Sequence, residues 1–490
     1  MSEYQNPLVV IGDSLSQAFM SGAVSRVDLS YGAMIAEALG EQGRFRTPSF
    51  EGAGGLPLNI EKLLREMSGR FGEKVSWYEF LPMLMATREF MAGVEKYWER
   101  GAGSQPVESA LYHNLAVWGF ELRDAYTVNA RIARHTMGEP DNNWLNQIPE
   151  HPMLRTAARV LDPGFDAERD GWSQFDVADE LARQGGIERL VVALGANNVL
   201  GTVLSLEMRW STEFDLQALP FERQANIYHP DHFARLYARL AERVDAVGAK
   251  HVFVATVPHV TIPPATRGVS PNKTLEGGGS AGRRYYEYYT RPWIWDDDFN
   301  PEKHEHLTRE QAIEIDGAID EYNRTIRETA AKRGWHVADM GGMLDNLAFR
   351  SSEGRPSYMF PEGLVSAIRE NPYTSYLVDN DRFRLDTRYL RAVPYGAARS
   401  GIQRLSRGGL FSLDGVHPTV VGQGLLADLF LETMRKAGAA PADAALRWDT
   451  IVESDMLVTD PPALLVNLAS CLASLERHWG LSEVLQLLND

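Results

Sequence analysis

Five short apolar runs, separated by helical patterns, restrict the fold of this chain more than any other feature. They occupy residues 9–11, 112–117, 190–194, 251–257 and 336–339, and each is followed within two residues by Gly or Pro. Short apolar runs that alternate with helices predict an α/β protein with a parallel, doubly wound sheet. The carboxyl ends of such strands share one edge of the sheet, where α/β proteins bind their ligands.

Helical patterns fill much of the chain between the apolar runs. They are clearest over residues 31–40, 59–101, 177–183, 231–247 and 309–332, and again from Val421 onward. The segment 140–172 is predicted to be irregular because it is rich in Pro, Asp and Asn.

Three segments interrupt the alternation, and we interpret them as insertions at 41–110, 262–306 and 351–409. Long irregular segments in a compact domain usually serve as functional loops or lids. We predict one domain over residues 1–437 and a C-terminal helical extension over 438–490, which follows a joint rich in Gly, Ala and Pro.

The composition is that of a globular protein with an acidic excess. Hydrophobic residues make up 44% of the 490 residues and charged residues 23%, and the formal net charge is -17. Negative charge repels phosphate backbones and anionic headgroups. The charge therefore argues against nucleic acid as a partner and against electrostatic docking on a membrane.

The sequence also lacks signs of export or membrane insertion. No apolar segment reaches the ~18 residues of a transmembrane helix, and the eight residues before Val9 are too few for a secretory signal peptide. We therefore predict a cytoplasmic protein with no integral membrane segment. Cys471 is the only cysteine, which excludes an intramolecular disulfide, and the apolar run 464–475 around it predicts a buried thiol.

A serine follows the first apolar run in the turn Gly12-Asp13-Ser14. A serine hydroxyl is a weak nucleophile and needs a histidine base, which a carboxylate usually orients. Asp414 and His417 meet this need because they lie three residues apart, so that the carboxylate can reach the imidazole. Taken singly, each motif has a plainer interpretation: Gly12-Asp13-Ser14 and Asp414-Gly415 would be turns, and His417 a histidine on the surface.

Two further residues could donate hydrogen bonds to the negative oxygen that forms during acyl transfer. Gly119 comes just after the second apolar run, and its lack of a side chain would let a carbonyl group approach its backbone N–H. Asn197 follows the third run and carries a side-chain amide. The alternative interpretations are that Gly119 is a turn glycine and that Asn197 caps the N-terminus of a helix.

Together these motifs form four blocks in a defined order along the chain. They are Gly12-Asp13-Ser14-Leu15, the segment 114–119, Gly195-Ala196-Asn197-Asn198, and Asp414-Gly415-Val416-His417-Pro418. The chain thereby resembles the SGNH (GDSL) hydrolase superfamily, which is named after the Ser, Gly, Asn and His of the four blocks. The resemblance covers few residues but spans the chain from residue 9 to about 436.

The resemblance implies a role for each matching residue. Ser14 corresponds to the nucleophile, His417 to the general base that later protonates the leaving alcohol, and Asp414 to the carboxylate that orients His417. The oxyanion hole would consist of the backbone N–H groups of Ser14 and Gly119 and the side chain of Asn197.

The resemblance also implies a fold and an activity. The family fold is a flavodoxin-like, three-layer α/β/α sandwich around a five-stranded parallel sheet, and its members hydrolyse carboxylic esters and some thioesters without a metal or organic cofactor. We therefore expect an esterase or lipase-like enzyme that acts on a small-molecule or lipid ester through an acyl-enzyme. A carbohydrate or cell-envelope O-acetyl esterase and a non-catalytic binding protein are the alternatives.

Two features depart from the family pattern. The third block usually reads Gly-x-Asn-Asp, and Asn198 replaces the aspartate, which keeps a hydrogen bond but not the charge. The second block lies far from the first because the segment 41–110 intervenes. Gly52, Gly54 or Gly55 could be the second-block glycine instead, but Gly119 follows an apolar run, as the geometry requires.

Other residues near the expected active edge are weaker candidates. Asn198 and His259 could line the pocket, with a loop histidine as the alternative for His259. The aromatic cluster at 285–295 could form a lid or a wall for an acyl chain, or simply pack within an insertion. Asp296-Asp297-Asp298 with His304 and His306 could suggest a metal site, but a solvated charged loop is the simpler interpretation, so no metal is expected.

Overall fold

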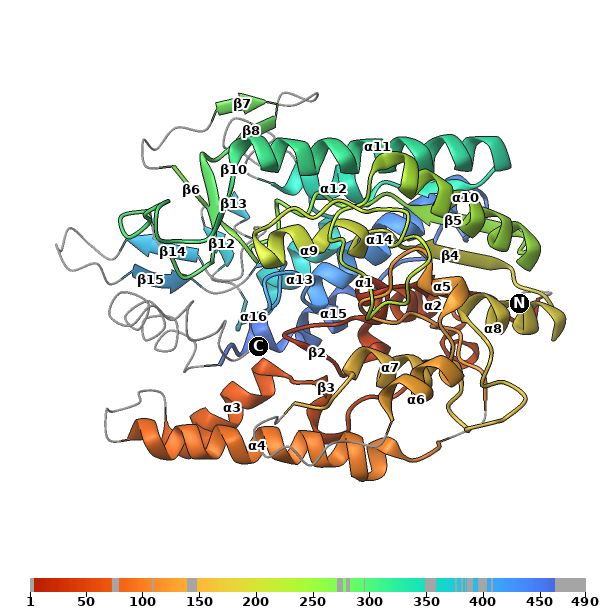
Figure 1. Cartoon of the computed structure of the whole chain (residues 1–490), viewed down its shortest axis with the longest axis horizontal. Helices are drawn as coiled ribbons and strands as arrows, with labels where there is room; N and C mark the ends of the chain where they lie inside the picture. Colours follow the sequence, from red (N-terminus) through yellow and green to blue (C-terminus); the bar gives the residue numbers. More distant parts are fainter. Residues whose placement is uncertain are drawn as a thin grey trace.

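In the computed structural model, a parallel sheet lies at the centre and helices cover both of its faces (Figure 1). The structure describes residues 4–462, with gaps at 73–78, 108–109, 139–147, 271–275, 279–282, 295, 349–357, 375–376, 380–381, 384, 386–390, 395–402 and 407–408. The buried thiol predicted for Cys471 falls outside the described residues.

Four parallel strands form the central sheet in the order β1-β4-β5-β11. Their bounds are β1 (Val9–Gly12), β4 (Arg189–Ala193), β5 (His251–Ala255) and β11 (His336–Ala338). Every residue of β1 and β4 is buried, so these runs are continuously apolar because both faces of the sheet are covered. The predicted α/β class with a parallel sheet is confirmed.

The prediction of a five-stranded sheet is wrong, because residues 112–117 form a single bridge to β1, between Asn114 and Val10. Side chains form hydrogen bonds to backbone groups of this segment that a neighbouring strand would otherwise pair with. Asn114 Oδ1 accepts the Ala116 N–H (3.1 Å), and Gln174 Nε2 donates to the Leu115 carbonyl (2.7 Å). The segment still runs beside β1, since the Leu115 N–H donates to the Val10 carbonyl (2.9 Å).

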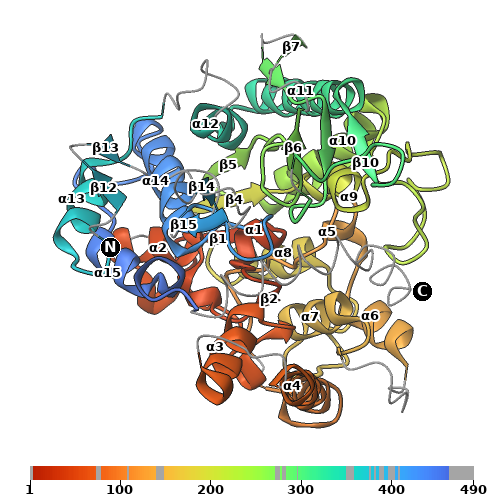
Figure 2. The ribbon, with the colours of Figure 1, turned by 90° about the vertical axis from the view of Figure 1, so that its left-hand side faces the viewer.

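Side chains of the sheet alternate between two hydrophobic cores, each closed by its own helices. Val9 and Ile11 lie in one core, which is covered by α8 (Gln174–Arg183), α10 (Pro230–Val247) and α11 (Arg309–Arg333). Val10 and Phe253 lie in the other, which is covered by α2 (Tyr31–Ala38) and α14 (Val420–Lys436). Figure 2 shows α2 and α14 on one side of the strands and α8 and α10 on the other.

The remaining helices are shorter or belong to the insertions. Their bounds are α1 (Ser14–Gln17), α3 (Ile60–Phe71), α4 (Phe80–Arg100), α5 (Asp124–Thr127), α6 (Ala130–Met137), α7 (Pro152–Leu161), α9 (Asn197–Ser205), α12 (Met340–Leu347), α13 (Glu362–Glu370), α15 (Trp448–Ser454) and α16 (Met456–Thr459). None of the described helices combines the length and the apolar character that a membrane-spanning helix needs.

The helical predictions hold, but two segments predicted to be irregular contain helices: α7 lies within 140–172, and α13 lies within 351–409. The pattern over 59–101 is confirmed by α3 and α4. The segment 140–172, predicted to be irregular, contains α7, which begins at Pro152 and buries Leu154, Ala157 and Leu161. Proline is well tolerated at the first position of a helix, so its presence did not exclude one.

Short strands occupy segments that show no sequence periodicity. Their bounds are β2 (Ala23–Val24), β3 (Leu56–Pro57), β6 (Arg267–Val269), β7 (Glu276–Gly278), β8 (Arg283–Tyr285), β9 (Tyr288–Thr290), β10 (His306–Thr308), β12 (Val378–Asp379), β13 (Arg382–Phe383), β14 (Arg391–Pro394) and β15 (Gln403–Ser406). The insertion 262–306 and the two residues after it thus form an antiparallel sheet, β10-β9-β6, and the antiparallel pair β7-β8. Such short strands are hard to recognise from alternation alone.

The described part of the predicted C-terminal extension packs on the domain. Ile451 and Val452 of α15 lie in the same core as α14, and Asp455 accepts a hydrogen bond from the Val421 N–H (2.8 Å). The boundary between residues 437 and 438 stays a prediction.

Candidate active site

A tight turn at the end of β1 holds Ser14. A Cβ atom at Gly12 would come within 2.1 Å of Ser16 Oγ and 3.0 Å of the Ala193 carbonyl oxygen, so only glycine fits there. Asp13 caps α1 by accepting a hydrogen bond from the Leu15 N–H (3.0 Å). Ser14 is therefore the first residue of α1, where a backbone N–H has no partner within the helix.

Asp414 holds His417 in the loop before α14. Asp414 Oδ2 accepts hydrogen bonds from His417 Nδ1 (3.1 Å) and the Gly22 N–H (3.0 Å), and its Oδ1 accepts the N–H groups of Val416 and His417, both at 2.9 Å. Burial alone would raise the pKa of Asp414, but the His417 ring and the N–H groups outweigh it and lower the pKa. Asp414 is therefore an ionised carboxylate that orients the imidazole.

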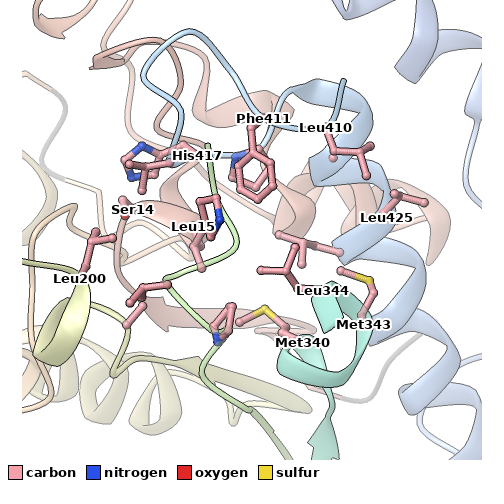
Figure 3. A pocket seen from close by; sticks show the side chains of 18 of the residues that line it. Ser14, Leu15, Leu200, Met340, Met343, Leu344, Leu410, Phe411, His417 and Leu425 are labelled. Carbon is pink, nitrogen blue, oxygen red and sulfur yellow. The ribbon is translucent and has the colours of Figure 1, made fainter. Parts of the chain in front are cut away.

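Ser14, Asn197 and His417 line one cavity, although they come from separate parts of the chain. Figure 3 shows Ser14 and His417 at the same end of this cavity. The Phe19 ring supports His417, with 4.6 Å between the ring centroids. No hydrogen bond joins Ser14 to His417 in the described structure, and such bonds often tighten only when substrate binds.

The loop that carries Gly119 is anchored on both sides. The Trp118 N–H donates to Gln17 Oε1 (3.0 Å), and the Phe120 carbonyl accepts a hydrogen bond from Asn197 Nδ2 (2.9 Å). Gly119 has a φ of +79°, and a Cβ atom there would lie 2.9 Å from Met153 Sδ, so glycine is required. Asn197 begins α9 but does not cap it, and its side chain links the Gly119 loop to the cavity.

The other glycines considered for the second block have a different role. Gly55 lies beside the β2–β3 pair, where a Cβ atom would come within 2.7 Å of the Val24 carbonyl oxygen, and its own carbonyl accepts Trp98 Nε1–H (2.7 Å). Gly52 lies against Tyr97. Neither these glycines nor Gly119 lines the cavity, but the Gly119 loop is bonded directly to Asn197.

Asn198 supports the Gly119 loop from behind. Its Oδ1 accepts the Leu122 N–H (3.1 Å), and its Nδ2 donates to Glu121 Oε2 (3.3 Å). Arg223 also binds Glu121 (2.7 Å), and burial raises the pKa of Glu121 to about 7. Asn198, predicted as a pocket residue, is thus buried behind the loop and does not line the cavity. Glu121 and Arg223 lie 102 residues apart and form no motif, so the sequence did not single them out.

His259, the other predicted pocket residue, belongs to a buried charged cluster. The adjacent Pro258 and Val260 line the cavity, whereas His259 Nδ1 bonds Asp345 (3.0 Å) and Nε2 bonds Asp320 (3.2 Å). Arg283, on β8 of the insertion, binds both aspartates. Burial alone would lower the pKa of His259, but the bonds to Asp320 and Asp345 raise it to about 9. The cluster therefore joins the insertion to α12, which carries Asp345.

Protonated His259 should stabilise the fold in a defined pH window. Its folded-state pKa of about 9 lies above its ordinary value of 6.5, so the contribution is complete below pH 6.5 and is lost as the pH rises through 9. Between these values the wild-type free energy of unfolding should fall by about 2 to 3 kcal/mol more than that of His259→Gln. Urea unfolding of both proteins at pH 6 to 9 measures this, and parallel pH profiles would contradict it.

The described part of the aromatic cluster at 285–295 packs within the insertion. Tyr285 and Tyr289 are buried in the core, and Tyr285 donates its hydroxyl hydrogen to Asp316 (2.9 Å). None of the described residues of the cluster lines the cavity, which favours packing over a wall for an acyl chain. Trp295 falls outside the described residues.

The acidic and histidine residues at 296–306 do not face a common centre. Asp296 pairs with Arg267 (3.4 Å), His304 Nδ1 accepts the Asn300 N–H (3.0 Å), and His306 Nδ1 bonds the His304 carbonyl (2.8 Å). Among all described residues, no group of three or more His, Cys, Asp or Glu side chains is placed to hold a metal ion.

Comparison with known proteins adds no relatives: no protein-family model matches the chain, and no curated protein is significantly similar to it. The site residues themselves must therefore carry any functional assignment.

Proposed function

We propose that this protein is a serine hydrolase of the SGNH (GDSL) type, which cleaves carboxylic esters through an acyl-enzyme. The observation that supports this most is that Ser14, Asn197 and the Asp414-bound His417 meet at one cavity. A nucleophile, a base with its orienting carboxylate, and an amide donor are the groups that acyl transfer needs.

The proposed reaction moves one proton back and forth through His417. Because Nδ1 of His417 is bonded to Asp414, Nε2 is the nitrogen left to take the Ser14 proton as Oγ attacks the ester carbonyl carbon. The protonated ring then gives this proton to the departing alcohol, which leaves Ser14 acylated. A water molecule attacks the acyl-enzyme with His417 again as base, and the acid is released. Asp414 stabilises the imidazolium in both halves of the reaction.

The proposed oxyanion hole collects donors from three segments. Ser14 contributes its backbone N–H, which has no partner within α1 because Ser14 is the first residue of that helix. Gly119 contributes its backbone N–H, and Asn197 its side-chain amide. Asn197 Nδ2 already holds the Phe120 carbonyl (2.9 Å), so one of its two hydrogens serves the loop and the other is left for the substrate oxygen.

Asn197→Ala should slow the chemical step rather than weaken binding. Loss of one oxyanion donor costs about 2 to 4 kcal/mol of transition-state stabilisation, so kcat should fall by about 10² to 10³. Steady-state kinetics with p-nitrophenyl esters measures this. Asn129→Ala is the matched control, because Asn129 also stands at a helix start but lies away from the cavity, where it caps α6. A fall in kcat of less than tenfold for Asn197→Ala would place the amide outside the hole.

A fluorophosphonate probe tests the proposed function directly. Such probes phosphonylate an activated serine, and mass spectrometry of the digested protein should find the adduct on Ser14. His417→Ala should abolish the labelling, since the hydroxyl then lacks its base. Absence of an adduct from the wild-type protein, or an adduct on another serine, would reject the assignment and favour the alternative of a non-catalytic binding protein.

A further inference from the structure

The cavity behind Ser14 is lined mostly by apolar residues. It has an empty volume of about 790 Å³ including its mouth. Its polar lining residues are Ser14, Asn197 and His417, and all the others are Ala, Gly, Leu, Met, Phe, Pro or Val. Figure 3 shows Met343 and Leu425 at the end away from Ser14. The cavity thus has a reactive end and a purely apolar end.

One wall of the cavity is a single face of α12. Met340, Met343, Leu344 and Leu347 all line it, at the i, i+3, i+4 and i+7 positions of a helix. Asp345 on the same helix is bonded to His259 and Arg283, which holds this wall in place. Unbranched Met side chains can adjust to a flexible chain beside them. On the other side, α14 contributes Leu425 and Leu426.

We infer that the substrates are esters of straight, medium-length aliphatic acids, whose chain lies along α12 with its end between Met343 and Leu425. This inference rests on the proposed function. Met340 and Leu347 are separated by seven positions, so the wall extends about 10 Å along the helix. That is the length of an extended chain of about eight carbons. An acetyl group would leave most of the cavity empty, and sugar hydroxyls would find no hydrogen-bond partners along the wall.

The acyl part, rather than the alcohol, is the group that uses this cavity best. The acyl chain stays bound through both half-reactions, so its contacts can stabilise both transition states. The alcohol must leave before water attacks, and tight apolar binding would hinder its departure. Each methylene buried against the wall should raise kcat/KM about fourfold.

A chain-length series tests the inference. With p-nitrophenyl esters, kcat/KM should rise at least about a hundredfold from acetyl to octanoyl in the wild-type protein. Met343→Trp places a large ring at the far end and should lower the octanoyl-to-acetyl ratio of kcat/KM at least about tenfold. Leu344→Ala enlarges the cavity and should shift the preferred chain to longer acids. Met359→Trp is the matched control, because Met359 is 90% exposed, and it should keep the wild-type ratio.

The outcomes separate this inference from the proposed function. If acetyl esters are hydrolysed but longer chains give no gain, the inference is wrong and the proposed hydrolase function stands. The same holds if Met343→Trp and Met359→Trp give the same octanoyl-to-acetyl ratio while thermal unfolding curves show that both variants are folded. A preference that follows alcohol length in alkyl acetates and not acyl length in ethyl esters also overturns it. If no ester is cleaved and the fluorophosphonate does not label Ser14, the proposed function itself fails.

Discussion

Replacing Ser14 by Ala is expected to lower kcat for p-nitrophenyl ester hydrolysis by about 10⁴-fold or more. The reason is that no acyl-enzyme can form without the Ser14 hydroxyl, and the remaining donors can only bind the substrate. Initial rates at high enzyme concentration measure the residual activity, and mass spectrometry should find no fluorophosphonate adduct at position 14.

The variant should remain folded, so lost activity can be attributed to chemistry. The Ser14 hydroxyl accepts or donates no hydrogen bond among the described residues, and truncation there should change the free energy of unfolding by about 0.5 kcal/mol at most. Ser205→Ala is the control for truncating a serine outside the cavity, because Ser205 lies on α9 and does not line the cavity. Its hydroxyl bonds the Gly201 carbonyl (2.8 Å) and Asn226 Nδ2 (3.0 Å), so this variant should lose more stability than Ser14→Ala and still keep its kcat. Turnover by Ser14→Ala within tenfold of the wild type would reject the acyl-enzyme mechanism.

The sheet was predictable where its strands are buried on both faces. Val9 to Ile11 and the run at 190–194 are continuously apolar because helices cover both sides, and both are strands. The run at 112–117 is aliphatic only from Leu115 to Val117 and contains Asn114, whose side chain bonds the Ala116 N–H and takes the place of a strand partner. A side chain that competes with the backbone is visible in a sequence, but the outcome of the competition depends on tertiary partners such as Gln174.

The candidate catalytic residues were predictable because their signals are local. Asp414 and His417 lie three residues apart, and the Gly-Asp-Ser turn has a recognisable shape requirement at Gly12. The groups that support the site are joined by tertiary packing instead, such as Arg223 with Glu121 and His259 with Asp320. Any arginine could pair with any of the many acidic residues, so no sequence pattern identifies these pairs.

The wall of the cavity illustrates the same limit. The aromatic residues at 285–295 suggested a wall because of their composition, yet Tyr285 and Tyr289 lie in the core. The wall comes from α12, whose Met340 and Leu344 have the spacing of any amphipathic helix. Periodicity shows that a helix has an apolar face, but it does not show whether that face meets a core or a cavity.

Replacing Asp414 by Asn is expected to lower kcat by about 10³ to 10⁴-fold. The amide has one acceptor oxygen where the carboxylate accepts four hydrogen bonds, from the N–H groups of Gly22 and Val416 and from the backbone N–H and ring Nδ1 of His417. The imidazole then loses the partner that orients it and stabilises its charged form. A buried N–H left without an acceptor should also cost about 1 to 3 kcal/mol of folding stability, which urea unfolding can measure.

Asp13→Asn is the control that makes this test specific. Asp13 is only 1% exposed and precedes Ser14 in the chain, but its side chain is bonded to the Leu15 N–H and not to His417. Burial raises the pKa of Asp13 to about 7, so at pH 6 its carboxyl is largely neutral, and an amide of the same shape can keep the cap. We expect kcat of Asp13→Asn at pH 6 to stay within tenfold of the wild type. Equal losses in the two variants would show that the contact of Asp414 with His417 is not what determines activity.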